Sequence, residues 1–79
     1  MKSKKYLISE FKKIFKSEIK KNVKESNKIY DYDTWDSLAN FNILLECEKK
    51  FKIKFRASEF NRLNSFKEII KVVKSRKKN

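Results

Sequence analysis

Asp36 and Ser37 place a carboxylate next to a hydroxyl in the stretch TWDSL, residues 34–38. A serine hydroxyl can be esterified, and an aspartate or serine at this kind of position can also cap a helix. The chain has no histidine and a single cysteine, Cys47. This composition excludes a Ser-His-Asp or Cys-His nucleophile system, a Cys/His metal site and an internal disulfide. The question is whether Ser37 carries a group or only starts a helix.

The composition favours one small helical domain. The chain has 79 residues, of which 39% are hydrophobic, and it carries seven Phe, three Tyr and one Trp. That is enough apolar material for one core and too little chain for two. There is no Gly and no Pro, so tight turns with positive φ have no favourable residue and β-hairpins are not expected. We expect helices joined by polar connections.

The net charge of +12 is unevenly distributed along the chain. Residues 1–30 have a net charge of +7, residues 31–48 carry five acids and no Lys or Arg, and residues 49–79 have a net charge of +10. Ser37 therefore lies within an acidic segment of a basic chain. A surface selected only to bind phosphates has no use for such a segment.

The first predicted helix spans about residues 4–20 and is followed by a long loop over 21–36. Apolar residues in the helix recur at i, i+3 and i+4 and form one stripe: Leu7, Ile8, Phe11, Ile14, Phe15 and Ile19. The loop is long for a compact domain. We expect four of its side chains to attach it to the core: Val23, Ile29, Tyr30 and Trp35.

The second predicted helix spans 37–51, because Asp36 and Ser37 are favourable N-cap residues. Its apolar residues cover enough of the helix circumference to contact more than one neighbouring element. The side chains expected to face inward are Leu38, Phe41, Leu44, Leu45, Cys47 and Phe51. Those expected on the exposed side are Ala39, Asn42, Glu46, Lys49 and Lys50.

The remainder of the chain predicts an extended segment, a short helix and a final helix. KIKF, residues 52–55, has no partner strand, so we expect a loop that buries Ile53 and Phe55. A short helix follows over 57–63. Ser65 and Glu68 have the spacing of a capping box, and the last helix over 66–75 is expected to bury Phe66, Ile69, Ile70 and Val73.

This order of elements resembles the acyl carrier protein family, which includes peptidyl and aminoacyl carrier domains. The resemblance lies in DSL at 36–38, the following helix through NILLECEKKF, then IKF and LNSFKEIIKVV, and it covers the whole chain. WDSL in particular is similar to discrete carriers of surface polysaccharide or specialised biosynthesis. The implied fold is all-α, a small four-helix acyl-carrier-like bundle with three main helices, one short helix and a long loop between the first two.

The resemblance implies that 4′-phosphopantetheine from coenzyme A is attached to Ser37 by a separate phosphopantetheinyl transferase. Asp36 and Leu38 are then the flanking signature of the attachment site. Taken without the resemblance, Leu38 is expected to be a packing residue. Trp35, Asn42 and Glu46 are expected to contact partner enzymes that load and accept the cargo. Such a carrier is not an enzyme and has no catalytic residue of its own.

The same resemblance implies a cleft that shelters the cargo, lined by Leu44, Cys47, Phe55 and Leu63, although core packing is the preferred reading of Cys47. Bulky rings are expected to fill the core and leave little room for a long acyl chain: Phe41, Phe51, Phe55, Phe60 and Phe66. A short acyl, hydroxyacyl or aminoacyl cargo is therefore expected.

Two other readings remain open. The chain departs from the strongly acidic carriers, since Lys49 and Lys50 stand near the end of the second helix. The fold can instead serve as an unmodified protein-interaction module. A small basic nucleic-acid-binding protein is also conceivable, but no recognised binding motif accompanies the lysines, and no nucleic-acid partner is expected.

No apolar run reaches membrane-spanning length and no secretory segment follows MKSKK, so a cytoplasmic protein is expected. We also expect it to be a monomer.

Overall fold

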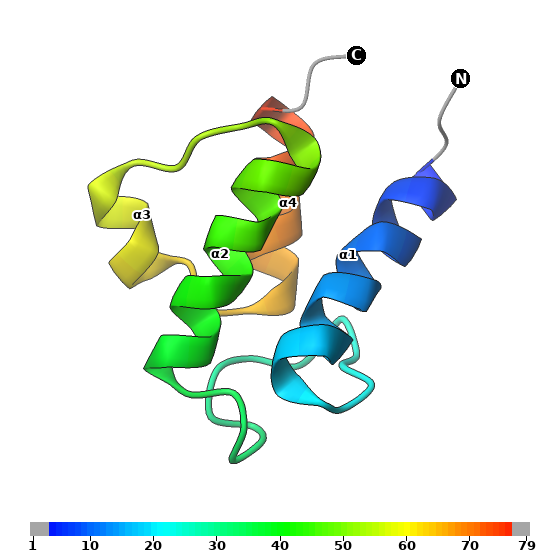
Figure 1. Ribbon diagram of the computed structural model, residues 1–79, viewed down its shortest axis with the longest axis vertical. Coiled ribbons are helices and arrows are strands. Elements are labelled where there is room, and N and C mark those ends of the chain that lie inside the picture. The colour runs from blue at the N-terminus through cyan, green and yellow to red at the C-terminus, as the bar shows by residue number, and fades with distance from the viewer. Residues whose placement is uncertain (1–3, 77–79) are drawn as a thin grey trace.

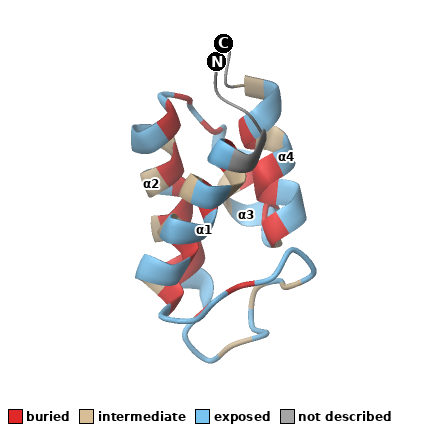
Figure 2. Cartoon of the chain, turned by 90° about the vertical axis from the view of Figure 1, so that its right-hand side faces the viewer, coloured by how far each residue is buried: buried red, intermediate tan, exposed pale blue. Residues whose placement is uncertain are grey.

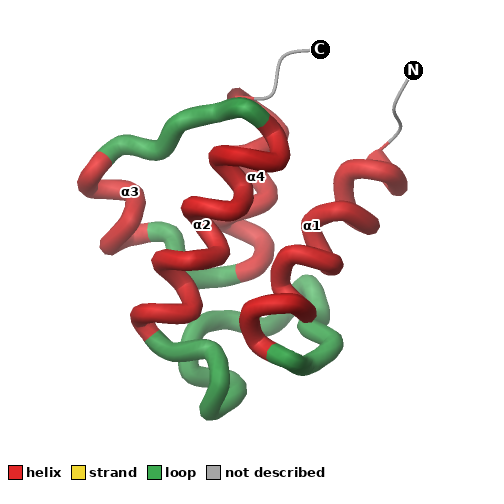
Figure 3. Tube along the Cα trace, viewed as in Figure 1, coloured by secondary structure: helices red, strands yellow, loops and turns green. Residues whose placement is uncertain are grey.

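The chain forms a small four-helix bundle, as predicted. The computed structural model describes residues 4–76. Three longer helices and one short helix follow each other along the chain (Figure 1; Figure 3): α1 (Lys4–Ile19), α2 (Ser37–Phe51), α3 (Ala57–Arg62) and α4 (Phe66–Arg76). Each bound lies within one residue of the position expected from the sequence. The all-α fold class is confirmed.

Aromatic rings from three parts of the chain meet in the core. Phe11 and Phe15 of α1 lie with ring centroids 4.9 Å apart, and each lies 5.0 Å from Phe66 at the start of α4. The indole of Trp35 meets Phe15 edge-on at 5.2 Å. Such tilted and edge-on ring pairs add to the stabilisation from buried area. Figure 2 shows the buried residues of the helices gathered on their inward sides.

The long loop between α1 and α2 is attached to the rest of the protein by buried side chains and by backbone hydrogen bonds, and its Trp35 ring lies in the core, as predicted. Val23 is buried, and Ile29 packs against the core. The backbone of the loop pairs with the connection between α3 and α4, since the Ile29 amide donates to Asn64 O at 2.8 Å and the Phe66 amide donates to Asn27 O at 3.1 Å. The expectation that Tyr30 attaches the loop to the core is wrong, because its side chain is exposed.

Asp36 and Ser65 cap the starts of α2 and α4, as expected. Asp36 is the N-cap of α2, and its carboxylate accepts the Ala39 amide at 2.9 Å. The Ser65 hydroxyl accepts the Glu68 amide at 3.2 Å at the start of α4. Lys52 ends α2 in the left-handed conformation, with φ 56°, a role that glycine usually fills. The following segment buries Ile53 and Phe55, as predicted.

The buried face of α2 is rotated relative to the prediction. The buried residues are Ala39, Asn40, Ile43, Leu44, Cys47 and Phe51. Leu38, Phe41 and Leu45, which were expected inside, are 68%, 44% and 37% exposed, whereas Ala39 was expected outside. The physical reason is that the amide of Asn40 is satisfied internally, so a polar residue occupies the centre of the buried face and the largest apolar side chains flank it.

A partly buried ion pair fixes the short helix α3 against the end of α4. Glu59 is 3% exposed. Its carboxylate accepts two hydrogen bonds from the Arg76 guanidinium and one from the Arg56 amide at 2.8 Å, and Arg62 lies 3.5 Å away. The Arg76 guanidinium, followed by the Arg56 amide, lowers the pKa of Glu59 from 4.5 to about 2. A six-residue helix is too short to be stable alone, so this pair secures it.

The lowered pKa of Glu59 predicts acid sensitivity. The stabilisation is complete above about pH 4.5 and is lost as the pH falls towards 2, because over this range the unfolded chain binds a proton at Glu59 while the folded protein keeps that carboxylate ionised. Glu59→Gln should lower the free energy of unfolding at pH 7 by about 2 kcal/mol, a value typical of hydrogen bonds to charged groups. Urea unfolding across this pH range measures the effect. The difference in the free energy of unfolding between the wild type and Glu59→Gln should narrow as the pH falls.

The matched control is Glu46→Gln. Glu46 pairs with Lys49 at 3.5 Å on the surface, so its substitution should change the free energy of unfolding by no more than about 0.5 kcal/mol. Equal losses in the two variants at pH 7 would contradict the structural role of Glu59.

Candidate functional site

Ser37 is the first residue of α2, and its side chain is exposed. Asp36 precedes it in an extended conformation. The Asp36 carboxylate accepts a hydrogen bond from the Ala39 amide, and the Asp36 carbonyl accepts one from the Asn40 amide, each at 2.9 Å. The amides of Ser37 and Leu38 belong to the first turn, whose N–H groups have no acceptor within the helix. The hydroxyl thus lies at the positive end of a 15-residue helix.

The phenol of Tyr30 lies against the Ser37 hydroxyl. The two oxygens are 2.8 Å apart, and either can donate. Tyr30 has φ 72°, which is unusual for a bulky residue, and its amide donates to Trp35 O at 2.8 Å. The loop backbone therefore fixes the place from which the phenol reaches Ser37. Sequence reasoning did not identify this contact, and no spacing rule signals it.

Asn40 connects the loop, α2 and the end of α3 through its buried side chain. Its Oδ1 accepts the indole N–H of Trp35 at 2.9 Å, and its Nδ2 donates to Leu63 O at 2.8 Å. The side chain is thus bonded on both sides, and none of the buried side-chain nitrogen or oxygen atoms within residues 4–76 lacks a partner. These bonds hold the residue before Asp36 and the end of α3 in fixed positions around Ser37.

A hollow of about 430 Å³ opens beside Ser37. Polar groups and rings share its lining, which consists of Ile29, Tyr30, Ser37, Asn40, Phe41, Phe60, Asn61 and Asn64. The Phe41 and Phe60 rings pack at 5.1 Å between centroids and form one wall. The hollow therefore offers both amide groups and an apolar surface next to the hydroxyl.

The predicted cleft residues lie elsewhere. Leu44, Cys47, Phe55 and Leu63 are buried in the core, and none of them lines the hollow beside Ser37. Burial raises the pKa of the Cys47 thiol to about 12, so this side chain is packing material rather than a nucleophile. The physical reason is that these four side chains are taken up by the hydrophobic core, so the surface beside Ser37 is lined by other residues.

The predicted partner contacts need a similar correction. Trp35 is 0% exposed, which confirms its expected attachment of the loop to the core and rules out the docking role that the resemblance implied for its ring. Leu38, for which packing was the first reading, is instead strongly exposed beside Ser37. Asn42 and Glu46 follow at intervals of four residues along α2 and are half-buried.

No helix within residues 4–76 has the length and apolar character needed to cross a membrane. In the same part of the chain, no group of three or more His, Cys, Asp or Glu side chains is arranged to hold a metal ion. Comparisons with protein-family models, curated proteins and solved structures gave no match.

Replacing the buried amide tests how the site is positioned. Asn40→Leu has a similar volume but leaves the Trp35 indole N–H and the Leu63 carbonyl without their partner. At about 1–3 kcal/mol for each of the two buried groups left unpaired, we expect the free energy of unfolding to fall by about 2–6 kcal/mol. Urea unfolding followed by circular dichroism measures the loss, and the fluorescence of Trp35, the single tryptophan, reports the change around its ring.

Asn42→Leu is the matched control, because it is the same substitution on the same helix at a half-buried position. Its effect should stay within about 0.5 kcal/mol. If Asn40→Leu were as well tolerated as Asn42→Leu, the Asn40 bridge would not position the site.

Proposed function

We propose that this chain is a carrier protein that holds an acyl or aminoacyl group as a thioester on 4′-phosphopantetheine attached to Ser37 and delivers it to partner enzymes. The observation that supports this most directly is the exposed Ser37 hydroxyl at the first residue of α2, directly after its Asp36 cap. A structural cap needs no second capping residue beside Asp36. Exposure of the neighbouring hydroxyl therefore favours a role outside the fold.

The start of α2 suits a phosphodiester. Esterification of Ser37 places a negative charge where the helix dipole and the first-turn amides of Ser37 and Leu38 favour an anion. The chain has no histidine to activate the hydroxyl, so activation belongs to the phosphopantetheinyl transferase. Asp36 and Leu38 flank the hydroxyl and are the residues that this enzyme would contact.

The hollow beside Ser37 suits the attached group. Phosphopantetheine supplies the terminal thiol that holds the cargo. Asn61 and Asn64 offer side-chain amides able to pair with the amides of the arm, and the wall of Phe41 and Phe60 offers apolar contact. A volume of about 430 Å³ with a mixed lining favours a short acyl or aminoacyl cargo over a long acyl chain.

The exposed side of α2 is the proposed docking surface for the loading and acceptor enzymes. Leu38, Phe41 and Leu45 recur at helical spacing and remain exposed, and Asn42 and Glu46 lie along the same helix. Exposed apolar side chains grouped next to a functional residue mark interaction sites. Contact at this surface is therefore mainly apolar, with Glu46 supplying the negative charge.

Incubation with a broad-specificity phosphopantetheinyl transferase and coenzyme A tests the proposal. We expect the intact mass of the wild type to rise by one phosphopantetheine arm. Ser37→Ala should show no gain. The matched control, Ser58→Ala, removes another exposed hydroxyl in the first turn of a helix and should be modified like the wild type. Absence of any gain in the wild type with several transferases would favour the unmodified interaction module instead.

Tyr30→Phe tests the contact with the attachment residue. The transferase has to free the Ser37 hydroxyl from its hydrogen bond with Tyr30, at 2.8 Å. One such bond is worth about 1 kcal/mol, so kcat/KM for modification should rise about fivefold in Tyr30→Phe. Tyr32→Phe is the control, because the Tyr32 hydroxyl donates to Asn27 instead. A slower reaction in Tyr30→Phe would mean that the phenol presents the hydroxyl rather than covering it.

A further inference from the structure

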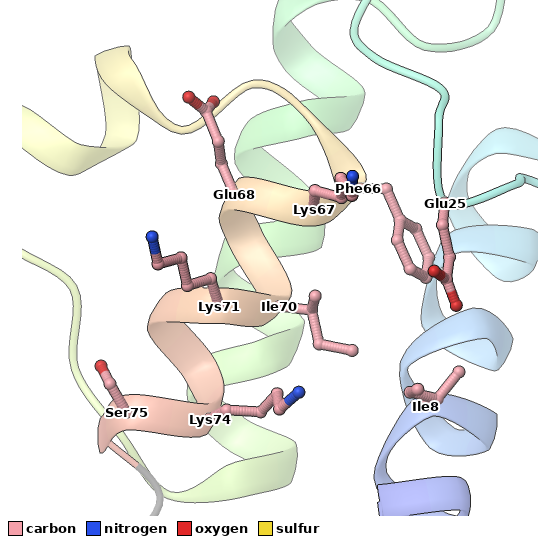
Figure 4. A pocket seen from close by; sticks show the side chains of 9 residues that line it. All are labelled: Ile8, Glu25, Phe66, Lys67, Glu68, Ile70, Lys71, Lys74 and Ser75. Carbon is pink, nitrogen blue, oxygen red and sulfur yellow. The ribbon is translucent and has the colours of Figure 1, made fainter.

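A groove of about 700 Å³ runs between α1 and α4, away from Ser37. Its apolar floor comes from Ile8 of α1 and from Phe66 and Ile70 of α4. Figure 4 shows Ile70 and Lys74 pointing from α4 toward α1, with Ile8 facing them from the other side. None of the residues that line this groove lines the hollow beside Ser37. A partner held here leaves the attachment site accessible.

Lysines dominate the rim of the groove. Lys67, Lys71 and Lys74 stand along α4 at intervals of four and three residues, and all three line the groove. None of them forms an ion pair with a side chain in residues 4–76, where the salt bridges involve other cations. Glu25 and Glu68 are the two acids in the lining. The lining therefore carries three cations against two anions, and its net charge is positive.

The basic surface continues onto α1. A second hollow of about 570 Å³ shares Ile8 with the groove and is lined by further lysines of α1, namely Lys12, Lys13 and Lys16. Of these, Lys13 pairs with Glu10 at 3.3 Å, while Lys12 and Lys16 have no such partner among the described residues. The apolar floor of the groove thus has lysines on both sides.

We propose that this groove binds an acidic amphipathic helix of a partner protein. Such a helix lays an apolar side on Ile8, Phe66 and Ile70 and places carboxylates next to the lysines. The spacing of Lys67, Lys71 and Lys74 matches carboxylates placed one helical turn apart, over about 10 Å at 1.5 Å per residue. A small anion can meet only part of such a row.

Two other occupants fit the observations less well. A second copy of this chain brings its own net charge of +12 to a basic surface, which opposes association. An anionic membrane offers matching charge, but its surface does not enter a groove whose apolar residues form the floor. The acidic helix satisfies both the charge of the rim and the shape of the floor.

The experiment uses a synthetic fluorescent peptide that forms an amphipathic helix, with leucines on one side and glutamates one turn apart beside them. Fluorescence anisotropy measures its binding to the full chain at low salt, and amide NMR shifts locate it. We expect binding, with the largest shifts at Ile8, Phe66 and Ile70. A variant carrying Lys67→Glu, Lys71→Glu and Lys74→Glu should bind about tenfold more weakly or worse, since three surface ion pairs become repulsive contacts.

The matched control carries Lys49→Glu, Lys52→Glu and Lys54→Glu. These lysines are exposed and line neither hollow, and the control has the same net charge as the groove variant. It should retain binding within about threefold of the wild type. Equal losses in the two variants would overturn the proposal by showing unspecific attraction. Shifts confined to α2, or groove-dependent binding of phosphatidylserine vesicles without binding of the peptide, would overturn it too.

Discussion

The buried amide of Asn40 is the contact on which the arrangement around Ser37 depends. It holds the Trp35 indole on one side and the Leu63 carbonyl on the other, at 2.9 and 2.8 Å. Through these bonds one side chain of α2 joins the end of the long loop to the end of α3. The start of α2 is thereby fixed, and the Asp36 cap leaves the Ser37 hydroxyl outside. A buried polar network of this kind specifies one arrangement only while all its members are bonded.

Helix bounds could be predicted from the sequence because they depend on local chemistry. The Asp36 cap, the Ser65 cap and the apolar stripe of α1 each act over a few residues, and each is present in the structure. The rotation of α2 could not be predicted, since a buried Asn40 is favourable only when Trp35 and Leu63 are already in place. The burial of Glu59 could not be predicted either, because its partner Arg76 lies 17 residues away in the sequence. The three-residue spacing between Arg56 and Glu59 resembles a capping signal but does not reveal this ion pair.

The site residues divide in the same way. The exposure of Ser37 follows from its position at a helix start, which a sequence reveals. The Tyr30 contact follows from a left-handed loop residue, for which the sequence offers no glycine as a marker. The core positions of Leu44, Cys47, Phe55 and Leu63 follow from tertiary packing. The sequence therefore indicated the candidate attachment residue, whereas the structure was needed to find its surroundings.

The proposed carrier role can be tested most directly on protein isolated from its own cells. Trypsin should release residues 29–49 as one peptide, because no Lys or Arg lies within it before Lys49, and Ser37 is its single serine. Tandem mass spectrometry of this peptide should find a phosphopantetheine arm, free or loaded, on Ser37. An unmodified peptide throughout a growing culture, or an arm attached at another residue, would contradict the account.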